Sequence, residues 1–206
     1  MISNRPRMGS GNGAKPLTHQ KNRPFDLGHT LERLRDARAA AEECRLNGSC
    51  ALPSRQVMLD VIDGLVAALF PCHFGPANLH GDDIDCFVSG TLNTKLSALQ
   101  DQVSLELELA QQDAKRNRVS VDASGTAREI VANLASALPE VRALLDTDIR
   151  AAYAGDPSAK SLDEVICCFP GVAAMIRHRI AHQLYKSGVT LLARMIAEFA
   201  HSQTGI

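Results

Sequence analysis

Apolar residues recur three or four positions apart along most of this chain, which is the spacing of residues on one face of an α-helix. A clear example follows Pro53, where Val57, Val61, Leu65 and Leu69 form an apolar stripe. Strand-like alternation is absent, and no hairpin dipeptide separates two alternating runs. The pattern therefore predicts an all-α fold, a multi-helix bundle with long antiparallel helices and no β-sheet.

The breaks between the stripes predict where the helices begin and end. Helices are expected over residues 25–47, 54–70, 82–116, 125–138, 139–155, 161–169, 172–187 and 190–205. Residues 73–81 are expected to form a loop, because they contain Gly75-Pro76 and Gly81. Pro139 is expected to open a separate helix, since proline is tolerated at a first helical position and disrupts a helix interior.

Capping residues mark the helices near the carboxyl end of the chain. Ser161 is followed three residues later by Glu164, which is the capping-box pattern of a helix start. Gly188 and Gly205 are placed to end two helices, and Thr190 is placed to cap the helix between them.

The first 25 residues differ in composition from the rest. They contain five basic residues and no acidic residue, and they are rich in Gly, Asn and Pro. We expect a disordered basic tail over residues 1–25 and one helical domain over residues 26–206. A transit peptide is an alternative for the tail, although the segment has few Ser and no amphipathic stripe.

The charge and the cysteines narrow the class of protein further. The net charge is −1, and no run reaches the ~18 apolar residues of a membrane span, so neither nucleic acid nor a membrane is an expected partner. The six cysteines include no C-x-x-C pair, and there is no secretory signal. We therefore expect reduced thiols in a cytoplasmic protein, with the adjacent Cys167 and Cys168 as small buried groups.

A series of short motifs between about residues 141 and 206 resembles serine O-acetyltransferase in order and spacing. The motifs are Asp148-Ile149, Gly155-Asp156-Pro157, Phe-Pro-Gly-Val-Ala-Ala at 169–174, His-Arg-Ile-Ala-His-Gln-Leu-Tyr at 178–185, Ala197-Glu198 and Gln-Thr-Gly-Ile at 203–206. Residues 52–55 and 69–71 resemble the longer amino-terminal extension of one subgroup.

The resemblance implies an enzyme that transfers the acetyl group of acetyl-CoA to L-serine and so makes O-acetylserine for cysteine biosynthesis. The family has a helical amino-terminal region, which assembles subunits, and a left-handed β-helix of hexapeptide repeats. Its catalytic His and Asp lie in the β-helix. This sequence has no such repeat, and the β-helix would begin directly after Ile206.

Several expectations follow for the chain itself. It holds no catalytic residue of the family's dyad, binds no cofactor, and on its own is predicted to be inactive. Acetyl-CoA and L-serine are the substrates of the complete enzyme. We expect a homo-oligomer, a trimer or a dimer of trimers. The alternative is a free-standing helical oligomerisation module without catalysis.

Asp156 is the one residue to which the resemblance gives a substrate-binding role. In the family, the Asp of this Asp-Pro pair contributes to the serine and cysteine pocket across a subunit boundary. The residue before a proline is restricted to extended geometry, so its carboxylate would be held in place to receive an ammonium group. The alternative is an ordinary helix start, with Asp156 as cap and Pro157 at the first position.

His178 and His182 lie one helical turn apart and could bind a metal on one face. A di-metal bundle needs two Glu-x-x-His motifs, and only Glu198 and His201 form one. Packing and hydrogen bonding are therefore favoured for these histidines, and no metal site is assigned. The neighbouring cations Arg177, Arg179 and Lys186 are interpreted as a solvated or interface face rather than an anion site.

Overall fold

The computed structural model describes residues 26–40, 51–117 and 126–206, which contain eight helices and no strand. The all-α prediction is confirmed for these residues. The chain divides into two units, residues 1–47 and 48–206. The predicted tail over residues 1–25 lies outside the described residues, and so does the predicted helix end at Asn47-Gly48.

The first unit contains helix α1, Gly28–Ala40. Just before this helix, the Asp26 carboxylate accepts a hydrogen bond from the Gly28 amide at 3.1 Å. No residue of α1 is buried, and Leu27, Leu31 and Leu34, which the sequence places on one stripe, are about half exposed.

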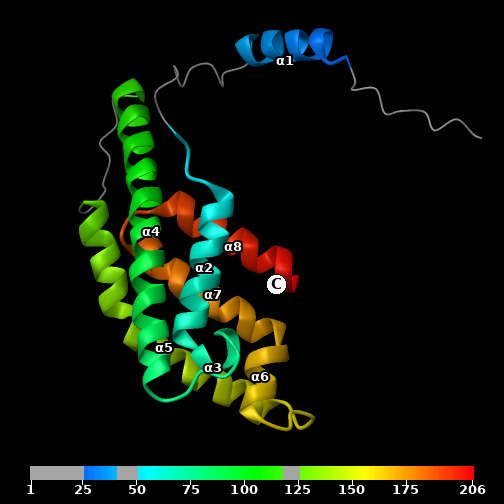
Figure 1. Cartoon of the computed structure of the whole chain (residues 1–206), viewed down its shortest axis with the longest axis vertical. Helices are drawn as coiled ribbons and strands as arrows, with labels where there is room; N and C mark the ends of the chain where they lie inside the picture. The colour runs from blue at the N-terminus through cyan, green and yellow to red at the C-terminus, as the bar shows by residue number, and fades with distance from the viewer. Residues whose placement is uncertain (1–25, 41–50, 118–125) are drawn as a thin grey trace, which may run out of the picture. The chain divides into compact units, whose positions relative to one another are not determined.

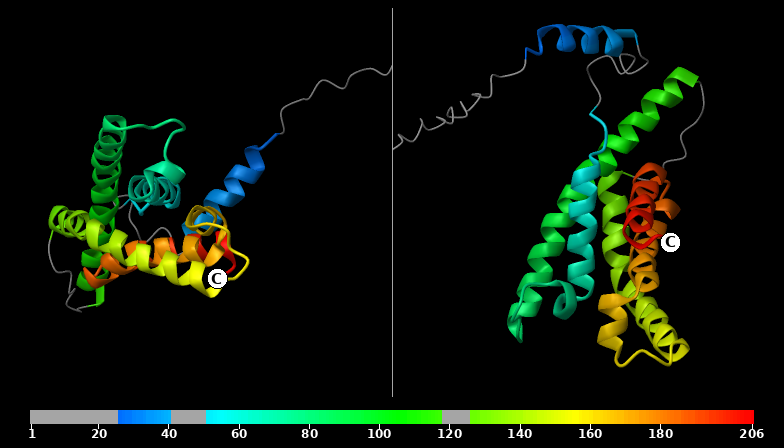
Figure 2. Two further views of the ribbon diagram at one scale, coloured as in Figure 1. Left: turned by 90° about the horizontal axis from the view of Figure 1, so that it is seen from below. Right: turned by 90° about the vertical axis from the view of Figure 1, so that its right-hand side faces the viewer.

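The second unit is a bundle of seven helices. They are α2 (Arg55–Leu69), α3 (Pro71–Phe74), α4 (Asp82–Asn117), α5 (Ala127–Gly155), α6 (Leu162–Cys168), α7 (Pro170–Lys186) and α8 (Thr190–Thr204). Helix α2 packs against α4 and runs in the opposite direction, and α4 also packs against α5 (Figure 1). Helices α7 and α8 form a hairpin, in which α7 packs on α5 and α8 packs on α2 and α4 (Figure 2).

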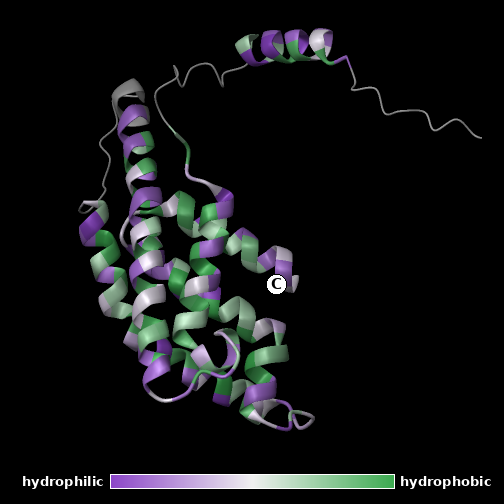
Figure 3. Cartoon of the chain, viewed as in Figure 1, coloured by the Kyte–Doolittle hydropathy of each residue, from purple (hydrophilic) through white to green (hydrophobic). Residues whose placement is uncertain are grey.

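One continuous core joins these helices. Leu65, Leu99, Leu145, Ile180 and Ile196 come from five different helices, and each has an exposed fraction of 0%. Apolar and polar residues are interspersed along the helices of the bundle (Figure 3), and the buried residues of α2, α5, α7 and α8 are all apolar. Among the described residues, no helix combines the length and apolar character that crossing a membrane requires.

Local hydrogen bonds explain why several helices start where they do. The Ser54 hydroxyl accepts from the Val57 amide at 3.3 Å and caps α2. A full capping box begins α5: the Thr126 hydroxyl accepts from the Glu129 amide, and the Glu129 carboxylate accepts from the Thr126 amide at 2.7 Å. Ser161 caps α6 as predicted, since its hydroxyl accepts from the Glu164 amide at 3.0 Å.

Helix α5 shows that the prediction at Pro139 was wrong. The two helices expected over residues 125–138 and 139–155 form one helix with Pro139 inside it. Leu134, Leu138, Val141 and Leu145 keep helical spacing across the proline, and all four are buried. Burial of this continuous stripe outweighs the hydrogen bond that the proline cannot make.

The start of α8 also differs from the prediction. Thr190 is the first residue of the helix rather than its cap, and Val189 in the cap position offers no side-chain acceptor. The buried Glu106 of α4 takes that role, because its two carboxylate oxygens accept from the amides of Leu191 and Leu192 at 2.8 and 2.9 Å. The helix ends as predicted at Gly205, whose φ of 73° is left-handed.

Candidate functional site

Asp156 lies in a tight turn between α5 and α6. Its Oδ1 atom accepts from the Ser158 amide at 2.9 Å and from the Ser158 hydroxyl at 2.7 Å. Its carbonyl oxygen accepts from the Ala159 amide at 3.1 Å, which closes a turn with Pro157 at the second position. The turn therefore fixes the direction of the Asp156 side chain through its own local hydrogen bonds.

The helix-start interpretation of Asp156 is wrong in this structure. Asp156 follows the last residue of α5 with an extended backbone, φ −119° and ψ 103°, and Pro157 opens no helix. The next helix begins at Leu162 behind its own cap, Ser161. The observed hydrogen bonds by themselves give Asp156 the role of stabilising this turn.

One oxygen of the Asp156 carboxylate, Oδ2, could bind a ligand. The two hydrogen bonds from Ser158, side chain first and backbone second, lower the pKa of Asp156 below its ordinary value, so the carboxylate is ionised at neutral pH. Both bonds go to Oδ1, and among the described residues no donor is bonded to Oδ2. Oδ2 is thus available to accept a hydrogen bond from a ligand cation such as an ammonium group.

The paired histidines of α7 stack on each other. The rings of His178 and His182 have centroids 5.9 Å apart and an interplanar angle of 17°. In the part of the chain that the structure describes, no group of three or more His, Cys, Asp or Glu side chains is placed to hold a metal ion. Glu198 and His201 both lie on α8, and the His201 ring contacts the Ile206 carbonyl at 3.2 Å.

Two of the three basic residues that the sequence places on a solvated or interface face of α7 form ion pairs within the bundle, whereas Lys186 is exposed. Arg179 makes a two-pronged ion pair with Asp148 of α5, at 2.6 and 2.8 Å, and the Asp148 hydrogen bond raises the Arg179 pKa. Arg177 is 11% exposed and forms an ion pair with Asp63 of α2 at 3.5 Å. The spacing along α7 could not predict these two ion pairs, because it does not show which side chains of α2 and α5 lie opposite Arg177 and Arg179.

The cysteine prediction is corrected in one respect. Cys167 and Cys168 are exposed rather than buried, because Val165 and Ile166 occupy the inward positions of the short helix α6. Cys72, Cys86, Cys167 and Cys168 are all free thiols. Cys44 and Cys50 lie outside the described residues.

The chain is similar in sequence to several serine acetyltransferases. A plasmid-borne serine acetyltransferase of Synechococcus elongatus is 42% identical over 156 residues, which are 75% of this chain and 49% of that protein. The serine acetyltransferase of Mycobacterium tuberculosis is 52% identical over 59 residues, 29% of this chain and 26% of that protein. No family model matches the chain.

Solved structures agree. Serine acetyltransferase 1 of Entamoeba histolytica, in complex with L-cysteine, has a TM-score of 0.54 at 30% identity, covering 70% of this chain and 47% of that one. Isoform 3 of the same organism, in complex with cysteine, has a TM-score of 0.56 at 29% identity, covering 71% and 46%. This chain is homologous to the serine acetyltransferases.

The homology has a definite extent. The chain spans about half the length of the Synechococcus elongatus serine acetyltransferase and of the Entamoeba histolytica chains that it matches. The regular structure of the described residues of this chain is helical throughout.

Sequence reasoning missed one feature near these motifs, a pocket beside Arg177. Arg177 follows Ala173 by four residues, and both line the pocket. The sequence could have predicted the partial burial of Arg177, because this residue flanks the buried stripe of Val172, Ile176 and Ile180. An arginine beside such a stripe often packs its aliphatic part against the core.

Proposed function

We propose that this chain forms the helical region of a serine O-acetyltransferase, the enzyme that moves the acetyl group of acetyl-CoA onto the hydroxyl of L-serine. The observation that carries the proposal is the homology over 156 residues to a serine acetyltransferase. In this function the chain assembles subunits and lends Asp156 to the serine site, while the His and Asp of the family's dyad come from a β-helix.

The geometry of Asp156 supports its part in the proposal. Serine carries an ammonium group, and an ionised carboxylate held by a rigid turn is a suitable acceptor for it. Ser158 occupies Oδ1 and leaves Oδ2 available, so a ligand does not need to break the turn in order to bind. The lowered pKa keeps Asp156 charged in the pH range of a cytoplasmic enzyme.

A chimera tests the function directly. In the plasmid serine acetyltransferase of Synechococcus elongatus, the matching region is replaced by this chain, and serine-dependent CoA release is measured. The chimera should be active, and the 206-residue chain alone should release no CoA, because none of its residues matches the family's dyad. A soluble, folded chimera without activity would contradict the proposal and favour the non-catalytic oligomerisation module.

Within the active chimera, Asp156→Asn tests the substrate role. Loss of the charge-assisted contact should raise KM for L-serine roughly ten- to hundredfold and leave KM for acetyl-CoA nearly unchanged. The matched control is Glu140→Gln, which removes an exposed carboxylate from α5 and should change neither constant. Unchanged serine kinetics in Asp156→Asn would confine Asp156 to its turn.

A further inference from the structure

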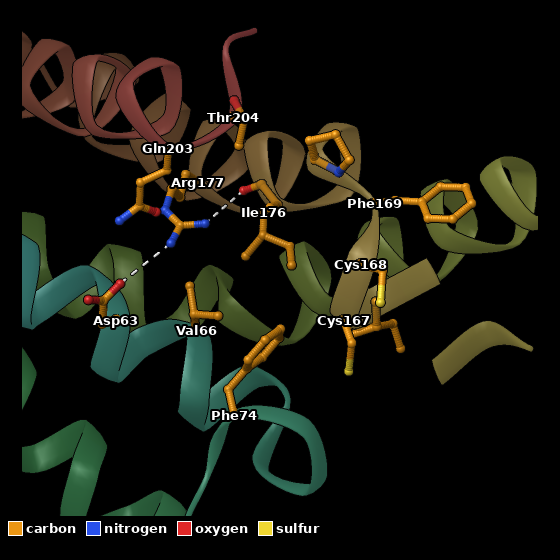
Figure 4. A pocket seen from close by; sticks show the side chains of 13 residues that line it. Asp63, Val66, Phe74, Cys167, Cys168, Phe169, Ile176, Arg177, Gln203 and Thr204 are labelled. Carbon is orange, nitrogen blue, oxygen red and sulfur yellow. Dashed lines mark hydrogen bonds and ion pairs between the residues drawn. The ribbon is translucent and has the colours of Figure 1, made fainter. Parts of the chain in front are cut away.

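A pocket of about 480 Å³ lies among α2, α3, α6, α7 and α8, and no residue of the turn that holds Asp156 lines it. Figure 4 shows polar side chains on one side of it, where Arg177, Asp63 and Gln203 come together. Phe74, Cys167 and Cys168 lie on the other side. The volume is within the range of small-molecule sites, and apolar walls with a few converging polar groups are typical of them.

The Arg177 guanidinium is short of hydrogen-bond acceptors. One terminal nitrogen donates to the Ala173 carbonyl at 3.1 Å, and the other forms the ion pair with Asp63 at 3.5 Å, which is long for a hydrogen bond. The Nε atom is buried and has no acceptor. A buried donor without a partner is costly, so the guanidinium lacks one of the contacts that would otherwise fix its position.

Asp63 does not fill that need. Its side chain is 55% exposed, so water solvates the carboxylate and weakens the pair, whereas the Arg177 side chain is 11% exposed. A carboxylate arriving inside the pocket would meet the two terminal nitrogens, which lie on the pocket side of the guanidinium, whereas Nε lies toward Gln203 (Figure 4). Arginine binds carboxylates well in this two-pronged geometry.

We propose that this pocket binds a small carboxylate with an apolar remainder, the carboxylate on Arg177 and the apolar group between Val66, Phe74 and Ile176. Asp63 competes with the ligand for the same guanidinium. The site is separate from the proposed acetyl transfer, and its test needs no catalysis. Cys167 and Cys168 act as reporters, because both are exposed thiols on the pocket wall.

The test uses 3-phenylpropionate as the probe and its neutral amide, 3-phenylpropanamide, as the matched ligand. The rate at which iodoacetamide alkylates each cysteine of the 206-residue chain is followed by peptide mass spectrometry. The acid should slow alkylation of Cys167 and Cys168 in a saturable manner. Cys86 is exposed on α4 and does not line the pocket, so its rate should not change.

Two substitutions test the recognition from opposite directions. Arg177→Gln should weaken binding of the acid at least about tenfold, because it removes the charge-assisted pair. Asp63→Asn should strengthen binding about three- to tenfold, because it removes the competing carboxylate. The control is Arg150→Gln, which changes an exposed arginine of α5 and should leave the affinity unaltered.

Equal protection by the acid and the amide would overturn the proposal, because it would show an apolar groove without carboxylate recognition. Absence of protection by the acid at millimolar concentration would overturn it as well. Unchanged or weaker binding in Asp63→Asn would overturn it even if Arg177→Gln failed to fold, since Asp63 is half exposed and its substitution leaves the core intact.

Discussion

Glu106 caps the amino end of a helix other than its own. It lies in α4, and its carboxylate accepts from two amides in the first turn of α8, 85 and 86 positions later in the chain. The amino end of a helix presents unpaired N–H groups and a positive partial charge, so an anion there satisfies both needs. No local pattern predicts this contact, because the donors are backbone atoms and the acceptor is distant in sequence.

Replacement of Glu106 measures the strength of that contact. Glu106→Gln leaves one acceptor and turns an NH2 group toward the other amide, and Glu106 is only 7% exposed. The free energy of unfolding should fall by about 1.5–3 kcal/mol, as for other hydrogen bonds to charged groups. Urea denaturation gives the value. Glu108→Gln, at an exposed position of the same helix, should stay close to wild type, and equal losses in the two variants would contradict the assignment.

At the scale of the element, the start of α5 should respond to acid. The hydrogen bonds from the Thr126 backbone and then its side chain lower the pKa of Glu129 below the ordinary value of 4.5. A lowered folded-state pKa stabilises the fold above the unfolded value, and this stabilisation is lost as the pH falls through the folded value.

The variant Glu129→Gln isolates this effect, because glutamine keeps the capping box and does not titrate. At neutral pH its free energy of unfolding should be slightly below that of the wild type, because the variant lacks the stabilisation that the ionised carboxylate provides. As the pH falls below 4.5, the wild type should lose more stability than the variant. Denaturant unfolding at a series of pH values provides the measurement, and parallel curves for the two proteins would rule out a role for Glu129.

Substitution of Pro139, in the same helix, should increase the stability of the fold. Pro139→Ala restores a backbone donor inside α5 and removes the clash of the ring with the preceding turn, so it should stabilise the fold by about 1–2 kcal/mol. Pro157→Ala, in the turn after α5, should instead destabilise by up to about 1 kcal/mol, because the turn loses its restricted residue. Thermal unfolding of both variants tests the contrast, and a destabilised Pro139→Ala would show that the helix depends on the proline.

Helices were predictable from sequence wherever a buried stripe and its caps agreed. In α2, the apolar stripe and the Ser54 cap favour the same boundary. The same agreement holds at the ends of α7 and α8, where Gly188 and Gly205 have positive φ. Prediction failed where another helix decided the outcome, as at Pro139 and Thr190. For the candidate site, Asp156 was found by resemblance, whereas the pocket at Arg177 required the positions of five helices.

At the scale of the whole molecule, we expect self-association as trimers or pairs of trimers. Several large apolar side chains of the hairpin face solvent, among them Met175 at 37% and Tyr185 at 60% exposure. Exposed apolar groups close together are typical of subunit contacts. Sedimentation velocity should find an assembly larger than a monomer, and Tyr185→Glu should shift it toward smaller species. Tyr153→Glu, on α5, is the matched control, and a monomeric wild type would contradict the expectation.

The contact between Glu106 and α8 also limits how this region can be recombined. The motifs that resemble those of serine acetyltransferases are concentrated after about residue 141, yet the acceptor that caps α8 belongs to α4, as do Leu99 and Val103 of the core. A crossover between α4 and α5 would exchange the motifs and leave behind the carboxylate on which their last helix depends. The smallest portable unit therefore extends from α2 to α8, well beyond the stretch after residue 141 that carries the motifs.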